Sequence, residues 1–327
     1  MHRKSMYLQW VYNALPRLEE LQNGEGCFFA PYWKKQKNYM NARWQEAALT
    51  FAWLSKKHPV YKKRVVDALN YWCTLQTRSG SFPEYSKYDR SFSATAFTSL
   101  AVVEISKYVS LTQQHLSVLL KAADWLVKND ETVFTNQEAV AYIALLKIFK
   151  LTKQEKYFNA AEKKLLKILK NQAQGGYYLE KKGFDLGYSS LTLEMLGLAY
   201  LETQDQRLLN SAEKFITFIA TGELPGKNVR ETRWVIADGF EIFANKTVHG
   251  KQALKKILEQ YNVKHLEQDI NFCTDLYRHC WAYDHASVTL PSFSLKEDAP
   301  PLQLLKRPRF LNILRPFGLH RIRKVIP

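Results

Sequence analysis

Two kinds of segment alternate along this chain, one amphipathic and the other apolar almost throughout. Residues 153–170 place Phe158 and Ile168 on one helical stripe and lysines on the opposite face. Residues 60–75 and 206–219 repeat this pattern. Each such segment is predicted to be a surface helix that buries one face.

Between these segments lie others that are apolar almost all round, at residues 92–105, 139–149 and 191–201. A helix without a polar face belongs in the interior. Strand-like alternation of apolar and polar residues is absent over any useful length, which favours an all-α fold. Six pairs of one outer and one inner helix fit the chain, with inner helices near residues 41–55, 91–106, 136–149, 187–203, 229–244 and 268–283.

A turn motif recurs between the helices, with the order glutamine, three or four residues, glycine and an aromatic residue. Its glutamines are Gln22, Gln76 and Gln172. A unit of about 50 residues fits this spacing if one copy has decayed, and residues 129–134 stand where that copy belongs. A weaker turn stands at residues 221–226. Helix pairs of this period build either an open solenoid or a ring that closes on itself.

These turns, each followed by an apolar inner helix, resemble the α/α toroids of polysaccharide lyases, glycoside hydrolases and terpene cyclases. Residues 183–203, 230–233 and 239–241 look like a group of bacterial toroid proteins allied to heparinase-like and alginate-lyase-like enzymes. The resemblance covers roughly residues 15–285 and implies an (α/α)6 toroid, incomplete or full. The chain departs from these enzymes in lacking an Asn-Asn-His-Ser motif, a β-sandwich domain and the acidic motifs of terpene cyclases.

The loops that enter the inner helices line one end of a toroid's funnel, so their polar residues are the candidate site. The predicted catalytic residues are Tyr188, Arg233, Asp185, Glu84 and His285. The predicted substrate-binding residues are Arg90, Asp89, Asn136, Arg230, Trp44 and Glu241. The histidine, cysteine and carboxylate positions show no metal-ligand spacing, and we predict neither a metal nor a cofactor.

Two types of reaction, β-elimination by a lyase and hydrolysis, could use these residues. A lyase neutralises a uronate carboxylate, removes the adjacent proton and protonates the leaving oxygen, for which the arginines, Asn136, Tyr188 and a histidine would serve. A hydrolase needs two carboxylates, such as Glu84 or Asp89 with Asp185. Against both stand structural roles: the aspartates could cap helices, the arginines could pair with carboxylates, and the turn aromatics could be core.

Charge and composition bear on partners. The 327 residues carry a net charge of +16, and 46% hydrophobic content excludes a disordered chain. After residue 286 the helical pattern stops, and residues 296–327 hold eight basic and two acidic residues, a net +6. We therefore predict a toroid domain at 1–286 and a proline-rich basic extension at 287–327. Apolar residues interleave with the extension's charges, so it either lies on an anionic membrane surface or docks on the toroid.

The leading hypothesis is an enzyme that binds an anionic oligo- or polysaccharide and cleaves it by lyase-type β-elimination. A glycoside hydrolase and a non-catalytic glycan-binding or scaffold protein of a cell-surface polysaccharide pathway are the alternatives. Nucleic acid is disfavoured because the basic residues of the body are lysines spread over outer helices. No apolar run reaches the length of a membrane span, and the first residues lack a signal-peptide pattern, so we expect a cytoplasmic protein. It could bind a lipid-linked glycan at the inner membrane face. The four cysteines are expected to be buried thiols.

Overall fold

The computed structural model describes residues 3–29, 41–86, 88–181, 183–222, 235–260 and 274–287. All of them belong to one unit, Met1–Leu295. The predictions for Arg230, Arg233, Cys273 and the extension beyond residue 287 lie outside the described residues. Within them the regular structure is helical, accompanied only by isolated β-bridges, which confirms the all-α prediction.

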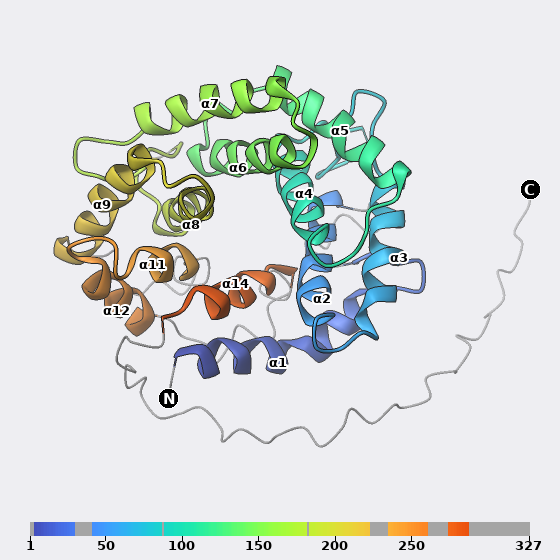
Figure 1. Ribbon diagram of the computed structural model, residues 1–327, viewed down its shortest axis with the longest axis horizontal. Coiled ribbons are helices and arrows are strands. Elements are labelled where there is room, and N and C mark those ends of the chain that lie inside the picture. Colours follow the sequence, from blue (N-terminus) through green and yellow to red (C-terminus); the bar gives the residue numbers. More distant parts are fainter. Residues whose placement is uncertain are drawn as a thin grey trace, which may run out of the picture. The chain divides into compact units, whose positions relative to one another are not determined.

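Six amphipathic helices form the outer layer (Figure 1). They are α1 (Arg3–Leu21), α3 (Tyr61–Thr74), α5 (Gln113–Lys128), α7 (Glu155–Lys170), α9 (Gln206–Thr221) and α12 (Gly250–Gln260). Each packs on the inner helix that precedes it along the chain, except α1, which contacts the last inner helix, α14. In α7 the buried residues follow one stripe that includes Ala161, Leu165 and Ile168, as the sequence predicts.

Six inner helices surround the centre of the unit in Figure 1. They are α2 (Ala48–Leu54), α4 (Phe92–Ile105), α6 (Thr135–Thr152), α8 (Leu186–Thr203), α11 (Asp238–Phe243) and α14 (Tyr277–His285), with the 3-10 helix η1 (Ala42–Ala47) leading into α2. Each contacts its neighbour in this order, and α14 contacts α2. The ring is therefore closed, and the fold is an (α/α)6 toroid rather than an open solenoid.

The ring is joined where its first outer helix meets its late inner helices. Arg3, on α1, donates from Nε to Oε1 of Glu241, on α11, at 2.8 Å, and the hydroxyl of Tyr7 donates to the same oxygen at 2.9 Å. All three side chains are buried. A buried ion pair with a second hydrogen bond tolerates loss of neither partner, so this contact fixes α1 in the ring. Glu241, predicted to bind substrate, is thus engaged in holding the fold together.

The recurring turns tie each outer helix to the next outer helix. The side-chain amides of Gln22, Gln76 and Gln172 each donate to the glycine carbonyl four residues on, at 2.8–3.2 Å. Each also donates, at 2.8 Å, to a carbonyl of the following outer helix. The aromatic residues of these turns, Phe28, Phe82 and Tyr178, are fully buried. The motif is a structural joint.

Its glycines are required by both conformation and space. Gly26 has a φ of +89°, and a Cβ there would lie 2.3 Å from the carbonyl carbon of Asp67. Gly176 has a φ of +98°, and its Cβ would lie 2.4 Å from the carbonyl oxygen of Lys214. An L side chain would be strained at both positions and would collide with backbone.

The decayed copy at residues 129–134 is replaced by an ion cluster. Lys164, a buried residue of α7, donates from Nζ to the carbonyl oxygen of Asn129 and to Asp130, both at 3.0 Å. It also donates to both carboxylate oxygens of buried Glu138 at 3.3 Å. A charged side chain of the outer helix here makes the link that a glutamine makes in the other turns.

Among the described residues, no helix combines the length and the apolar character that a membrane span requires. Cys27 and Cys280 are buried free thiols, as expected, and Cys73 is partly buried.

Candidate functional site

The amino-terminal ends of neighbouring inner helices meet at one end of the ring, which we call the mouth. Arg43 of η1 donates to the hydroxyl of Ser93, in the first turn of α4, at 3.2 Å. Phe134, which precedes α6, packs edge-on against Tyr188, in the first turn of α8, with ring centroids 6.0 Å apart. The backbone N–H of Ile236, before α11, donates to Ser190 of α8. The inner helices therefore run parallel, and the predicted mouth exists.

Three predicted carboxylates at the mouth organise loops and helix ends. Asp185 is the N-cap of α8 and accepts from the N–H of Tyr188 at 2.8 Å. Asp89 accepts from the N–H groups of Glu84 and Tyr85 at 3.3 and 3.1 Å. Glu84, which is buried, accepts from the hydroxyl of Ser91 at 2.5 Å. The capping role weighed for Asp185 is observed, whereas Ser91 rather than Asp89 caps α4.

The other predicted mouth residues differ in accessibility. Tyr188 is 41% exposed, and Arg90 is also exposed, so both are available to a ligand. Trp44 is 4% exposed and belongs to the core, which corrects its expected role as a binding surface. Asn136 is buried, and its backbone N–H donates to Oε1 of Glu180 at 3.1 Å.

Glu180 is a mouth residue that the sequence did not single out. Burial raises the pKa of Glu180 to about 8, and the nearby Asp185 adds to this effect, although the N–H of Asn136 opposes it. Its Oε2 atom and Oδ1 of Asn136 are buried without a hydrogen-bond partner. A carboxylic acid that keeps its proton at neutral pH therefore stands between α6 and α8.

Deeper in the ring, side chains from η1, α8, α14 and the turn before α14 form a central cluster. Its members are Arg43, Glu46, Glu194, Asp275, Tyr277 and Arg278. Nε of Arg43 donates to Oε1 of Glu46 at 2.8 Å, and the hydroxyl of Tyr277 donates to Oε2 of Glu46 at 2.8 Å. Arg278 pairs with Oε2 of Glu194, which lies halfway along α8. The adjacent residues Tyr277 and Arg278 thus connect η1 to α8.

Burial controls the proton affinities in the central cluster. It raises the pKa of Glu46 to about 7, and Asp275 adds to this effect, although Arg43 and Arg278 favour the charged form. It raises the pKa of Glu194 well above its ordinary value, despite Arg278. The cluster can therefore exchange a proton near neutral pH.

Accessibility separates the carboxylates of the central cluster. Glu46 and Glu194 are 2% and 0% exposed, whereas Asp275 is partly exposed. Asp275 also lies close enough to Arg43 and Arg278 to raise the pKa of each arginine, although burial opposes the rise. One carboxylate of the cluster is therefore open to a ligand, and the other two lie beneath it.

His285 does not lie at the mouth, contrary to the prediction. It is the last residue of α14, two turns beyond Tyr277, and therefore reaches the opposite end of the inner helices. There it lines a pocket of about 220 Å³, the rear pocket, together with Glu104, Lys147 and Glu202. Its Nδ1 lies 2.7 Å from Oδ1 of Asp238.

The rear pocket is held by paired charges. Lys147 bridges Glu104 and Glu202, and Lys107 and Lys150 pair with the same two carboxylates. Burial opposes a rise in the pKa of His285, but Asp238 outweighs it and raises that pKa. Among the described residues of the rear pocket, Glu104 and Glu202 are both paired with lysines. The rear pocket therefore offers fewer unpaired groups for catalysis than the central cluster.

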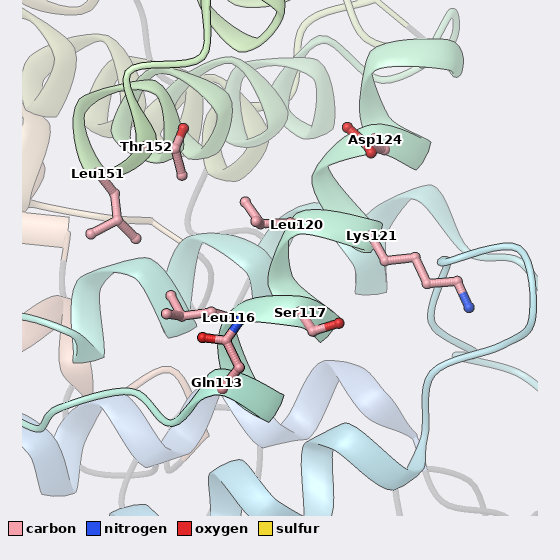
Figure 2. A pocket seen from close by; sticks show the side chains of 8 residues that line it. All are labelled: Gln113, Leu116, Ser117, Leu120, Lys121, Asp124, Leu151 and Thr152. Atoms are coloured by element: carbon pink, nitrogen blue, oxygen red, sulfur yellow. The ribbon is translucent and has the colours of Figure 1, made fainter.

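A larger hollow of about 510 Å³ lies away from the axis, between α5 and the end of α6 (Figure 2). It is lined mainly by Leu116, Leu120 and Leu151, and its charged residues are Lys121 and Asp124. The leucines point into the hollow, whereas the amine of Lys121 extends away from it. Such a lining provides no acid–base pair aimed at a ligand.

The glutamates of the central cluster could have been identified from the sequence, because each is a lone carboxylate in an inner segment. Glu194 is the single carboxylate of the apolar segment 191–201, and Glu46 is the single carboxylate of residues 41–55. Because a buried charge must be paired or neutralised, a lone carboxylate in such a helix indicates a network or a site. Glu104 and Lys147 show the same signal at the rear pocket. No group of three or more potential ligands among the described side chains is arranged to hold a metal ion.

No protein-family model matches this sequence, and no curated protein matches it. Solved structures do match its fold. An inactive variant of the α-1,6-mannanase from Salegentibacter sp. HEL1_6, in complex with α-1,6-mannotetrose, has a TM-score of 0.62 at 11% identity, over 85% of this chain and 98% of its own. D-mannose isomerase gives 0.63 at 12% identity over 86% and 97%. An unsaturated glucuronyl hydrolase specific for heparin gives 0.60 at 12% identity over 86% and 96%.

These likenesses confirm the predicted α/α-toroid fold, which this chain shares with a mannanase, an isomerase and a glucuronyl hydrolase. At 11–12% identity they establish the fold alone.

Proposed function

We propose that this protein is a glycan-processing enzyme that hydrolyses glycosidic bonds at the central cluster. The observation that carries the proposal is Glu46, a carboxyl group on the ring axis whose pKa is raised to about 7, beside the partly exposed Asp275. Glycoside hydrolysis needs one carboxylic acid that still holds its proton and one ionised carboxylate. Glu46 is the group that holds a proton near neutral pH, and Asp275 is the carboxylate of the cluster that a ligand can reach.

Carbohydrate is the substrate class that the fold comparisons support. The mannanase complexes hold mannotriose and mannotetrose, and the other similar structures include enzymes of sugar hydrolysis, isomerisation and epimerisation. The inactive mannanase variant is substituted at two consecutive aspartates, and this sequence contains no two consecutive aspartates. In this chain the two catalytic carboxylates of a hydrolase would have to come from separate elements, as Glu46 and Asp275 do in the central cluster.

In this proposal the partly exposed Asp275 contacts the sugar, and the buried Glu46 beneath it supplies the proton that the glycosidic oxygen takes up as the bond to the anomeric carbon breaks. Asp275 stabilises the positive charge that develops on the sugar ring and assists attack by water. Arg43 and Tyr277 hold the two oxygens of Glu46 at 2.8 Å and so fix its orientation. Arg278 pairs with Glu194 and lies within electrostatic range of Asp275.

The test is to incubate the full chain with neutral and anionic oligosaccharides and to follow the release of reducing ends. We expect Glu46→Gln and Asp275→Asn each to lower kcat at least 100-fold, which corresponds to loss of general acid–base catalysis. Glu20→Gln is the matched control, because Glu20 is an exposed carboxylate on an outer helix. Full activity in both cluster variants, with the fold intact by circular dichroism, would refute the assignment.

Lyase-type β-elimination is the second candidate, and the exposed pair Tyr188 and Arg90 at the mouth favours it. Both arginines of the central cluster lie beside carboxylates, so they are less suited to hold a uronate. A lyase would form an unsaturated sugar that absorbs ultraviolet light, whereas a hydrolase would not. Glycan binding without either product would favour the scaffold alternative. Cytoplasmic location and membrane contact by the extension stay predictions.

A further inference from the structure

Among the described residues, exposed aromatic side chains gather at the loops that enter the inner helices. Of the described phenylalanines, tyrosines and tryptophans, four expose more than a third of their surface: Phe29 at 38%, Tyr85 at 61%, Tyr88 at 79% and Tyr188 at 41%. All four stand in or beside loops that enter inner helices. The described outer helices and rear pocket contribute none.

Three of these aromatics, Tyr85, Tyr88 and Tyr188, belong to the entrances of two inner helices. Tyr85 and Tyr88 come from the loop before α4, and Tyr188 comes from the first turn of α8. Partial burial and the Glu84 carboxylate raise the pKa of Tyr85, and Tyr188 contributes to the same shift. Both entrances open at the mouth, where Arg43 reaches the first turn of α4 and Phe134 packs against Tyr188.

Arg43 connects the entrance of α4 to the central cluster. Arg43 lowers the pKa of Tyr85, against the rise that burial and Glu84 cause. Arg43 is also the arginine that binds Glu46. Because Arg43 also donates to Ser93, in the first turn of α4, at 3.2 Å, the entrance that carries Tyr85 and Tyr88 borders the side chains to which we assign the chemistry.

Backbone hydrogen bonds hold these tyrosines in place before any ligand arrives. Asp185 accepts from the N–H of Tyr188 at 2.8 Å, and Phe134 supports the ring of Tyr188 from the side. Asp89 accepts from the N–H of Tyr85 at 3.1 Å. The two aspartates, predicted from the sequence as catalytic or binding residues, fix the backbone that carries the exposed rings. A binding surface arranged in advance loses less entropy on binding.

We propose that Tyr85, Tyr88 and Tyr188 form a platform on which pyranose rings stack, so that the substrate is an oligosaccharide chain that extends out of the mouth. This inference rests on the proposed function and names its substrate class. One face of a pyranose presents C–H groups, which pack against an aromatic ring and release water from both surfaces. A single sugar at the central cluster would leave these rings uncovered.

The experiment measures binding by isothermal titration calorimetry. The probes are α-1,6-mannotetraose, cellotetraose and a heparin tetrasaccharide, each beside its disaccharide. We expect at least one tetrasaccharide to bind more tightly than its disaccharide, and Tyr85→Ala, Tyr88→Ala or Tyr188→Ala to weaken that tetrasaccharide about 10-fold. The affinity for the disaccharide should change less than 2-fold. Phenylalanine at the same positions should keep the affinity, because the ring and not the hydroxyl carries the contact.

Val248→Ala is the control, since Val248 is 86% exposed and lies outside the mouth. Wild-type affinity in all three alanine variants would overturn the platform, as would equal losses in the alanine and phenylalanine variants. Failure of every tetrasaccharide to bind would overturn it too. Tight, tyrosine-dependent binding without release of reducing ends would sustain the platform and refute only the proposed hydrolysis.

Discussion

Nε of Arg43 donates to Oε1 of Glu46 at 2.8 Å within a single turn of η1, yet burial keeps the pKa of Glu46 near 7. The adjacent arginine therefore does not compensate fully for removing this carboxylate from water. The 3-10 helix thus presents to the ring axis a group whose charge changes within the physiological range.

This relationship predicts how stability depends on pH. A pKa of about 7 in the folded chain, against about 4.5 in the unfolded chain, means that the folded state binds the extra proton between these values. The free energy of unfolding contributed by Glu46 therefore rises as pH falls from 8 to 4.5, by roughly 3 kcal/mol. Urea titrations of wild type and Glu46→Gln across this range should diverge by that amount. Parallel pH dependences would contradict it.

Lys164 should be indispensable although it lies in a lysine-rich helix. Lys164→Met removes the buried one of the two lysines that pair with Glu138, so we expect a loss of about 3–5 kcal/mol in the free energy of unfolding. Lys163→Met, at the exposed neighbouring position, should change stability by less than about 0.5 kcal/mol. The double variant Lys164→Met with Glu138→Met should recover part of the loss. Equal effects of the two single variants on chemical denaturation would show that the ion cluster contributes nothing.

The first turn contains its own matched pair of glycines. Gly26→Ala places a Cβ in the left-handed region and against the backbone of Asp67, so we expect a loss of roughly 3 kcal/mol or more. At Gly24 a Cβ meets nothing within 4 Å, so Gly24→Ala should be close to neutral. Thermal unfolding followed by circular dichroism compares them. If both variants melt with the wild type, the turn is not a rigid joint.

His279 predicts sensitivity to acid. It is buried between Tyr7 and Trp10, with ring centroids at 6.3 and 5.2 Å, and burial lowers its pKa to about 3, helped by Arg278. Below about pH 6.5 the unfolded chain takes up a proton that the folded chain refuses, so stability falls by about 1.4 kcal/mol per pH unit. Relative to His279→Gln, wild type should lose roughly 2 kcal/mol between pH 6.5 and 5 in urea denaturation. Identical slopes for the two proteins would rule this out.

The helical architecture could be predicted from the sequence because it depends on local periodicity. Residues 139–149 are apolar on all faces because their helix is buried on all sides. Residues 153–170 have a single apolar stripe because their helix is buried on one side. The turn motif was also readable, since Gln76 and Gly80 act within five residues of each other. Closure of the ring could not be predicted from the sequence, because it depends on contacts between the two ends of the domain.

The candidate site was predicted less well, for a related reason. Loop positions such as Tyr188 were placed correctly at the mouth, but the pairing of Arg278 with Glu194 joins residues 84 positions apart and leaves no local pattern. His285 was misplaced because α14 begins at Tyr277, so that the histidine falls at the far end of the helix. Arg230 and Arg233 lie outside the described residues, and their predicted roles stand as predictions.

The link between Arg3 and Glu241 spans 238 positions of the chain, which has a consequence for synthesis. A ribosome releases α1 long before α11 and α14 exist, so the apolar face of α1 that includes Trp10 and Leu18 has no partner during most of translation. The nascent chain must keep this helix from aggregating until its last inner helices emerge. Circular permutants that begin at another joint of the ring would shift that exposed interval to a different helix.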